Sequence, residues 1–283
     1  DEALQQAWNR IDVTRGTATP PSLPTRPAGN FFDPSRDQAY IDLTRFLNES
    51  MGEFANEMNC TAKESAAKPI LSVMWWGRGG EQFPYPLYSQ TSHNGPTSPI
   101  NLMGGQPGYR GERNNGNSGY YPWVTDSARL NGKIPVIELD FRTWTSIRSN
   151  LLTDVRNVFY WNEYDFSGAM KRELGKMLAV GGGAWFYDMT AGWFKDPKIL
   201  SEIAQAGRVA EHLAMNTDDV FAPSELVFVV DEDNIYNTTE QLGCWNGPNF
   251  HTVRKNQRAM LRSGLKFDFI YLADLMKRSM TGY

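Results

Sequence analysis

The sequence predicts a parallel α/β protein, and three observations lead to this fold class. Short apolar segments alternate with segments whose apolar residues have helical spacing along most of the 283 residues. Long loops rich in Gly, Pro and Asn follow the apolar segments. One apolar segment, 134–139, runs into charged residues, as barrel strands do where they open into the mouth of a (β/α)8 enzyme. We therefore expect residues 1–222 to form part of a (β/α)8 barrel.

Four segments have the composition of buried barrel strands. They are apolar, and polar or glycine-rich loops follow them. They are residues 69–76, 98–103, 134–139 and 183–188. If they are strands five to eight, in the C-terminal half of the barrel, segment 134–139 is the seventh. An antiparallel sheet through these segments would contradict this prediction.

Helices are expected between and before these strands. The longest lie at residues 37–66, 165–182 and 196–215, and shorter helical segments lie at 1–10 and 124–131. The helix at 196–215 carries Pro197 in its first turn, a position where helices tolerate proline. Five prolines between residues 15 and 36 predict an extended loop there.

The character of the chain changes after Pro223. The segment SELVFVVDED, residues 224–233, reads as a buried strand that ends in acidic residues. A helical segment follows, Gly264 ends it, and a second apolar strand leads into LADL. This strand–helix–strand order predicts that residues 223–283 begin a doubly wound, flavodoxin-like domain. The segment holds too few strands for the complete sheet of such a domain.

Composition excludes several classes of partner. The net charge of −4 does not indicate the basic surface that nucleic-acid-binding proteins use. No apolar run approaches the roughly 20 residues of a membrane-spanning helix. The two cysteines, Cys60 and Cys244, do not have metal-site spacing. We therefore expect no nucleic-acid partner, no membrane partner, no metal and no cofactor. The first ten residues, DEALQQAWNR, contain no readable targeting signal.

The segment IPVIELDFRTW, residues 134–144, carries the most informative charges. Glu138, Asp140 and Arg142 occupy alternate positions, so a continuing strand would place them on one side of the backbone. A retaining glycosidase needs one carboxylate that attacks the anomeric carbon and a second, about 5 Å away, that protonates the leaving oxygen. A neighbouring arginine would keep such a nucleophile ionised. The simpler alternative is an ion pair between Glu138 and Arg142 at the mouth of a loop.

Five segments, in order, resemble the β-galactosidases of glycoside hydrolase family 42 and their relatives. AWNRIDVT is similar to the segment after their fourth strand, and TSPINLMGGQPGYRGER to their strand-six segment. DSARLNGKIPVIELDFRTW and LGKMLAVGGGAWFYDMTAGWFKDPKI resemble their strand-seven and strand-eight segments. SELVFVVDED and LRSGLKFDFIYLADL resemble the start of their flavodoxin-like domain. The resemblance covers nearly the whole chain.

This resemblance implies a retaining glycoside hydrolase that acts on an oligosaccharide or polysaccharide, with Glu138 as the nucleophile. It also implies a homo-oligomer, a trimer in the family. The residues expected to bind substrate, all near strand ends, are Trp75, Trp76, Tyr109, Arg113, Asp140, Arg142, Trp185 and Asp188. Alternation turns either Trp75 or Trp76 toward the barrel axis, and Trp185 is the expected floor of the sugar site. Asp140 and Arg142 are expected to orient Glu138.

One part of the family pattern is missing. The acid/base glutamate of the family ends strand four, which would precede residue 1, so we expect half of an active site here. More chain, or another chain, would then complete the barrel. Glu163 imitates the family's Asn-Glu pair but follows strand seven, so we interpret it as a loop or helix-start residue. Two alternatives stay open: a non-catalytic carbohydrate-binding relative, and another barrel enzyme such as a lyase, which the missing glycine-rich phosphate loop disfavours.

Overall fold

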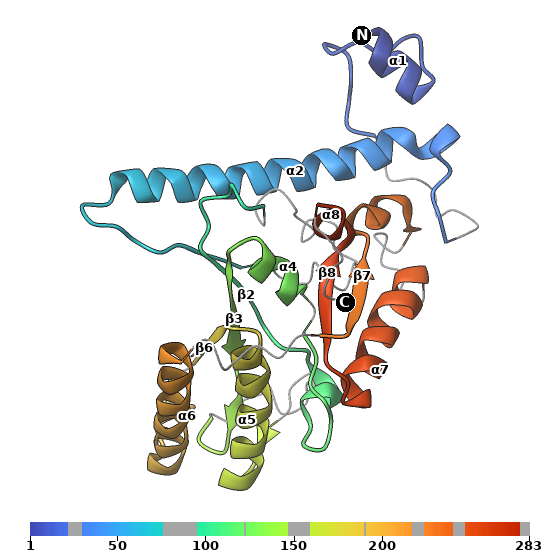
Figure 1. The fold of residues 1–283 in the computed structure, drawn as a ribbon. Helices are drawn as coiled ribbons and strands as arrows, with labels where there is room; N and C mark the ends of the chain where they lie inside the picture. Colours follow the sequence, from blue (N-terminus) through green and yellow to red (C-terminus); the bar gives the residue numbers. More distant parts are fainter. Residues whose placement is uncertain are drawn as a thin grey trace.

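The protein is a mixed α/β structure, seen here in a computed structural model (Figure 1). The structure describes residues 1–21, 30–75, 95–121, 123–146, 159–189, 191–216, 224–239 and 247–277. In the view of Figure 1, helix α2 (Pro34–Ser65) lies above the four-stranded sheet, helices α5 (Glu163–Ala179) and α6 (Pro197–Met215) lie below it, and a smaller C-terminal unit packs beside it.

The four-stranded sheet is entirely parallel. Its strands are β1 (Val73–Trp75), β2 (Leu102–Gly105), β3 (Ile134–Leu139) and β6 (Gly183–Phe186), and they are hydrogen-bonded in that order. The predicted parallel strands are therefore confirmed, and β3 has the predicted bounds. The order along the sheet follows the order along the chain, as in consecutive barrel strands. The eight-stranded barrel itself stays a prediction.

The long helices begin where their capping residues predict. They are α2 (Pro34–Ser65), α5 (Glu163–Ala179) and α6 (Pro197–Met215); α1 (Glu2–Trp8), α4 (Thr125–Leu130) and the 3₁₀ turn η3 (Arg110–Arg113) are short. The side chains of Asp33, Asn162 and Asp196 accept hydrogen bonds from the first-turn N–H groups of α2, α5 and α6. Proline occupies the first turn of α2 and of α6. Helices α5 and α6 lie side by side (Figure 1).

The two faces of the four-stranded sheet differ. Met103, Ile137 and Leu139 lie on one face and are completely buried in a core that includes residues of α4 and α5. The other face is also apolar, yet Val73 and Ile134 on it are 57% and 44% exposed. Parallel sheets in proteins are normally covered on both faces. Because Val73 and Ile134 are exposed, this second face is open in the described part of the chain.

The chain leaves the sheet directly after β3. Arg142 begins a separate two-residue strand, β4 (Arg142–Thr143), which pairs in parallel with β5 (Phe159–Tyr160). The sequence did not indicate this small sheet. Because β3 ends at Leu139, the expectation that Glu138, Asp140 and Arg142 alternate along one strand is wrong.

The C-terminal unit has the predicted strand–helix–strand order. Its strands β7 (Leu226–Val230) and β8 (Phe267–Tyr271) are parallel. Between them lie the 3₁₀ turn η6 (Glu232–Asn237), the π-helical turn η8 (Phe250–Lys255) and α7 (Asn256–Ser263); α8 (Leu272–Leu275) follows β8. Gly264 ends α7 with a φ of 75°, a left-handed conformation that glycine adopts without strain.

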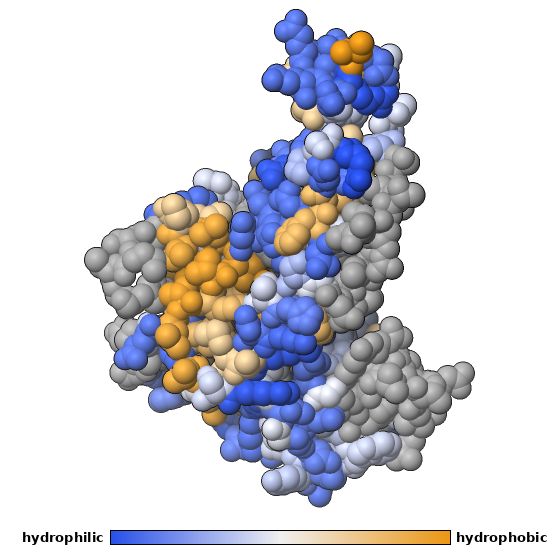
Figure 2. All heavy atoms as spheres, turned by 90° about the vertical axis from the view of Figure 1, so that its right-hand side faces the viewer, coloured by the Kyte–Doolittle hydropathy of each residue, from blue (hydrophilic) through white to orange (hydrophobic). Residues whose placement is uncertain are grey.

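Helix α4 joins the two parts of the molecule. A carboxylate oxygen of Asp126 accepts the N–H of Phe269 at 2.8 Å, and Ser127 Oγ accepts the N–H of Tyr271 at 2.7 Å. These side chains satisfy the edge of β8 as a neighbouring strand would. Strand β7 flanks β8 on its other side, and Leu226 and Val229 of β7 are exposed. Figure 2 shows an apolar patch on this side of the molecule, at the level of β7 and β8.

Candidate active site

Glu138 lies at the carboxyl end of β3, next to Trp185 of β6 in the register of the sheet. Its side chain is half-buried. Burial raises the pKa of Glu138 to about 7; the negative charge of Asp140 adds to this rise, and the positive charge of Arg113 opposes it. Glu138 is therefore a carboxyl group that exchanges its proton near neutral pH, as functional carboxyl groups often do.

Two tryptophans share the open face of the sheet with Glu138. The rings of Trp75 and Trp185 meet edge to face, with centroids 5.7 Å apart. The Trp185 indole crosses over β3 to reach Gly104 on β2: a Cβ atom at Gly104 would lie 2.9 Å from Trp185 Cη2 and 3.2 Å from a methyl of Val136. Glycine at position 104 thus makes room for the indole. The result is an aromatic surface beside the carboxyl group of Glu138. Trp76 lies outside the described residues.

A buried ion pair supports this end of the sheet. Arg113 Nη2 lies 2.5 Å from Asp140 Oδ1, and both side chains are almost fully buried. The Tyr109 hydroxyl donates to the other Asp140 oxygen at 2.9 Å, and the Arg113 guanidinium lies over the Tyr109 ring at 4.1 Å. Burial and the Asp140 charge raise the pKa of Tyr109 to about 12. Since Arg113 and Asp140 are buried, their contacts hold the site together.

Arg142 and Asp188 both contact Trp193, which lies in a different loop. The Arg142 guanidinium lies over the Trp193 ring at 5.0 Å, and Asp188 Oδ2 accepts the Trp193 N–H at 2.9 Å. The charges that act on Glu138 come from Asp140 and Arg113. Arg142 begins β4, after the chain has left the sheet, and the expectation that it orients Glu138 stays a prediction. The rise that burial causes in the Glu138 pKa exceeds the opposing effect of Arg113, so Glu138 is only partly ionised at neutral pH.

Glu163 takes the structural position expected of it. It is the first residue of α5, capped by Asn162, and its exposed carboxylate pairs with Lys198 at 2.9 Å. Another acidic residue was missed: Glu173 is completely buried in α5 and pairs with Arg172 at 2.6 Å. Its place between Met170 and Met177 on the apolar stripe of α5 was the available signal, since a buried carboxylate needs a partner.

The described ranges contain no group of three or more His, Cys, Asp or Glu side chains arranged to hold a metal ion. Among the same residues, no helix has the length and apolar character needed to cross a membrane. No family model, curated protein or solved structure matches the chain.

Proposed function

We propose that this chain belongs to a retaining glycoside hydrolase of the β-galactosidase type, with Glu138 as its nucleophile. The observation that carries the proposal is the position of Glu138: it ends a parallel strand beside an aromatic pair, on the open apolar face of the sheet. Active sites of (β/α)8 enzymes lie at the carboxyl ends of their strands. The family 42 resemblance assigns the nucleophile to the same residue.

The open face of the sheet supports the barrel. An apolar face on a parallel sheet needs a cover, and the inner face of a barrel receives one from the strands opposite. Val73, Trp75 and Ile134 would then point into the barrel. In this proposal residues 1–222 supply the C-terminal half of the barrel, and residues 223–283 begin a flavodoxin-like domain.

The proposed reaction is a double displacement. The ionised Glu138 oxygen bonds to the anomeric carbon while the bond from that carbon to the leaving oxygen breaks, and a second carboxylic acid gives that oxygen its proton. Water then attacks the anomeric carbon of the glycosyl ester and gives a proton to the second carboxylate, while the bond from that carbon to the Glu138 oxygen breaks and the Glu138 carboxylate is regenerated. Trp185 and Trp75 offer an apolar surface to the C–H face of a sugar beside Glu138.

The pKa of Glu138 gives this mechanism a testable pH dependence. The nucleophile must be ionised, and half of the Glu138 population is ionised near pH 7. The acidic limb of kcat/KM should therefore have its midpoint near pH 7, because this ratio reports the free enzyme. The same pKa is compatible with the alternative, a non-catalytic carbohydrate-binding protein. The neutral form of Glu138 can donate a hydrogen bond to a sugar hydroxyl.

Hydrolysis of aryl galactosides, glucosides and fucosides by matched variants tests the proposal. Glu138→Gln keeps the shape of the side chain and removes its charge, so turnover should fall by about 10⁴-fold or more. Glu138→Gly with added azide should regain activity and form a glycosyl azide of inverted configuration. Glu163→Gln is the control, because Glu163 is an exposed helix-start residue.

Near-normal turnover by the Glu138→Gln variant on every sugar tested would exclude Glu138 as the nucleophile. A wild-type protein that binds these sugars, with an affinity that depends on Glu138, but hydrolyses none of them would establish the carbohydrate-binding alternative.

A further inference from the structure

We infer that the C-terminal unit positions the proposed active site, through contacts that run from α7 to the loop of residues 106–121, which carries Arg113. The inference rests on the proposed role of Glu138. From Arg258 to Asp140, each step of this path is a contact between described residues, and the charges of Arg113 and Asp140 then act on Glu138, two residues before Asp140. Together the steps connect Arg258, in the C-terminal unit, with the carboxyl end of β3.

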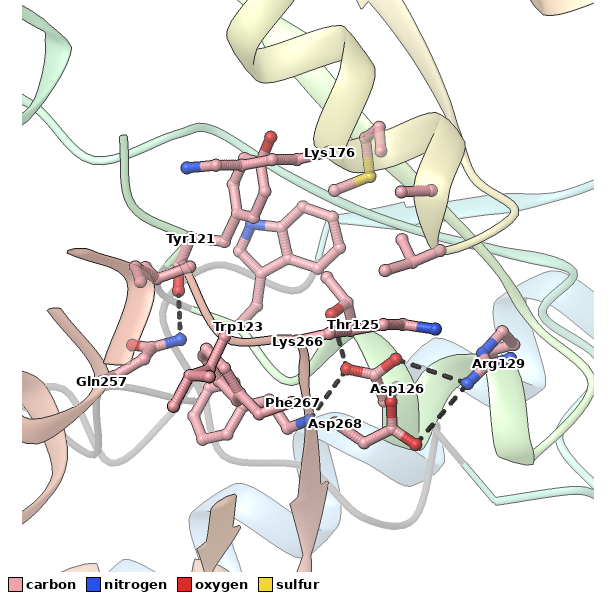
Figure 3. Close-up of a pocket in the computed structure, with 16 residues that line it drawn as sticks. Tyr121, Trp123, Thr125, Asp126, Arg129, Lys176, Gln257, Lys266, Phe267 and Asp268 are labelled. Atoms are coloured by element: carbon pink, nitrogen blue, oxygen red, sulfur yellow. Dashed lines mark hydrogen bonds and ion pairs between the residues drawn. The ribbon is translucent and has the colours of Figure 1, made fainter. Parts of the chain in front are cut away.

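Helix α7 contacts the 106–121 loop at several points. The Arg258 guanidinium forms an ion pair with the Glu112 carboxylate and lies over the Tyr120 ring, 4.8 Å from its centroid. The adjacent side chain, Gln257, donates its amide N–H to the carbonyl of Tyr121 at 3.0 Å (Figure 3). Tyr120 and Gln257 are buried. The α7 contacts therefore reach the 3₁₀ turn η3 and the end of the loop together.

Within the loop, Tyr120 fixes the position of Gly108. The Gly108 N–H donates to the Tyr120 carbonyl at 2.6 Å, and the Tyr120 ring packs against the glycine. A Cβ atom at position 108 would lie 2.8 Å from Tyr120 Cδ1, so only glycine allows this approach. The Gly108 carbonyl accepts a hydrogen bond from Arg113 Nε at 2.7 Å. Tyr120 thereby sets the place of an acceptor for Arg113.

The last step runs from Arg113 to Glu138. Arg113 pairs with Asp140 at 2.5 Å, and Tyr109, from the same loop, donates to Asp140. Arg113 and Asp140 are the charged side chains that act on the Glu138 carboxyl group. A shift of the 106–121 loop would therefore change the position of the Arg113 charge relative to Glu138.

A second set of contacts holds the C-terminal unit independently of this loop. Figure 3 shows Arg129 between Asp126 and Asp268, with ion-pair distances of 3.5 Å and 3.9 Å, beside a cavity of ≈ 220 Å³ that residues of both parts line. Asp126 and Ser127 of α4 hold the edge of β8. These contacts do not involve the 106–121 loop. Changes at Arg258 should therefore loosen the loop while the C-terminal unit stays docked through α4.

The experiment compares Arg258→Met, Glu112→Gln and the double variant with Arg262→Met in the full chain. Arg262 is exposed on the same helix and is the matched control. The first readout is amide exchange at Gly108. The second is the titration midpoint of the Glu138 carboxyl carbon, followed by NMR after ¹³C labelling of glutamate and assigned with Glu138→Gln. Neither readout uses a substrate, so the result stands whether or not the protein hydrolyses sugars.

Each single variant should speed Gly108 exchange about tenfold, because the opening of the loop becomes easier. Each should also raise the Glu138 midpoint by about half a pH unit, because the Arg113 charge recedes. The double variant should add little to either single change, since both remove the same ion pair. Arg258→Lys, which keeps the charge, should stay near the wild type, and Arg262→Met should match it.

An unchanged Glu138 midpoint in Glu112→Gln and in Arg258→Met would overturn the inference, even if the loop exchanges faster. Glu112→Gln keeps the size of a partly exposed side chain, so it reports on the path even if Arg258→Met does not fold. Equal shifts in Arg262→Met would also overturn it, because the effect would then be unspecific.

Discussion

Replacement of Arg113 by methionine should be among the most destabilising changes in this protein. The substitution removes the positive charge 2.5 Å from Asp140, where the two side chains are only 2% and 4% exposed. Removal of one partner from a buried ion pair leaves the other charge uncompensated and typically costs about 3–5 kcal/mol. The hydrogen bond to the Gly108 carbonyl and the contact with the Tyr109 ring are lost as well. We therefore expect a loss at the upper end of that range.

A double-mutant cycle separates the ion pair from general disruption of the fold. Asp140→Asn keeps an acceptor for the Tyr109 hydroxyl but leaves the Arg113 charge unpaired. The double variant Arg113→Met with Asp140→Asn buries no unpaired charge, so it should cost about 2 kcal/mol less than the sum of the single changes. Urea unfolding at constant m-value measures all three free energies. A coupling below about 0.5 kcal/mol would refute the reasoning.

The other predictions concern single sites. Glu138→Gln should melt at a higher temperature than the wild type at pH 8 but not at pH 4. Burial raises the Glu138 pKa from 4.5 to about 7, so ionisation of Glu138 as the pH rises through this range destabilises the wild-type fold. A lower melting temperature of the variant at pH 8 would contradict this. Asp126, buried beside β8, has a pKa raised from 3.8 to about 6, so the wild type should lose about 2 kcal/mol of stability at this site as the pH rises from 4 to 7. Asp126→Asn should remove that part of the pH dependence in urea titrations. Gly104→Ala should destabilise the fold by about 1–3 kcal/mol and alter the near-UV circular dichroism of tryptophan, because its methyl group would meet the Trp185 ring; an unchanged spectrum would show that Trp185 does not lie over this glycine.

The regular elements could be predicted because their signals are local. Strand β3 begins with a continuous apolar run, residues 134–137, directly before the charge at Glu138, and its bounds agree with the sequence pattern. Helices α5 and α6 begin at capping residues that the sequence displays. Strands β4 and β5 have only two residues each, which is too short for a periodic pattern. Their pairing depends on tertiary contacts alone.

The candidate site was predictable in position but not in its partners. Chain order and alternation place Glu138 at a strand end, and the register then brings Trp185 beside it. The sequence favoured Arg142 as the neighbouring cation because it is only four residues away. Arg113 lies 27 residues from its partner Asp140, and no local pattern connects them. Long-range ion pairs of this kind depend on how a loop folds back over the sheet.

Covalent trapping tests the role of Glu138 most directly. A 2-deoxy-2-fluoro glycoside with a dinitrophenolate leaving group needs no proton from an acid, so its reaction depends on the nucleophile alone. Mass spectrometry of the intact protein should show the addition of one fluoroglycosyl group, and peptide mapping should place it on Glu138. The Glu138→Gln variant should remain unlabelled. A label on any other residue, or a wild-type protein that hydrolyses aryl glycosides but never forms the adduct, would contradict the assignment of Glu138 as the nucleophile.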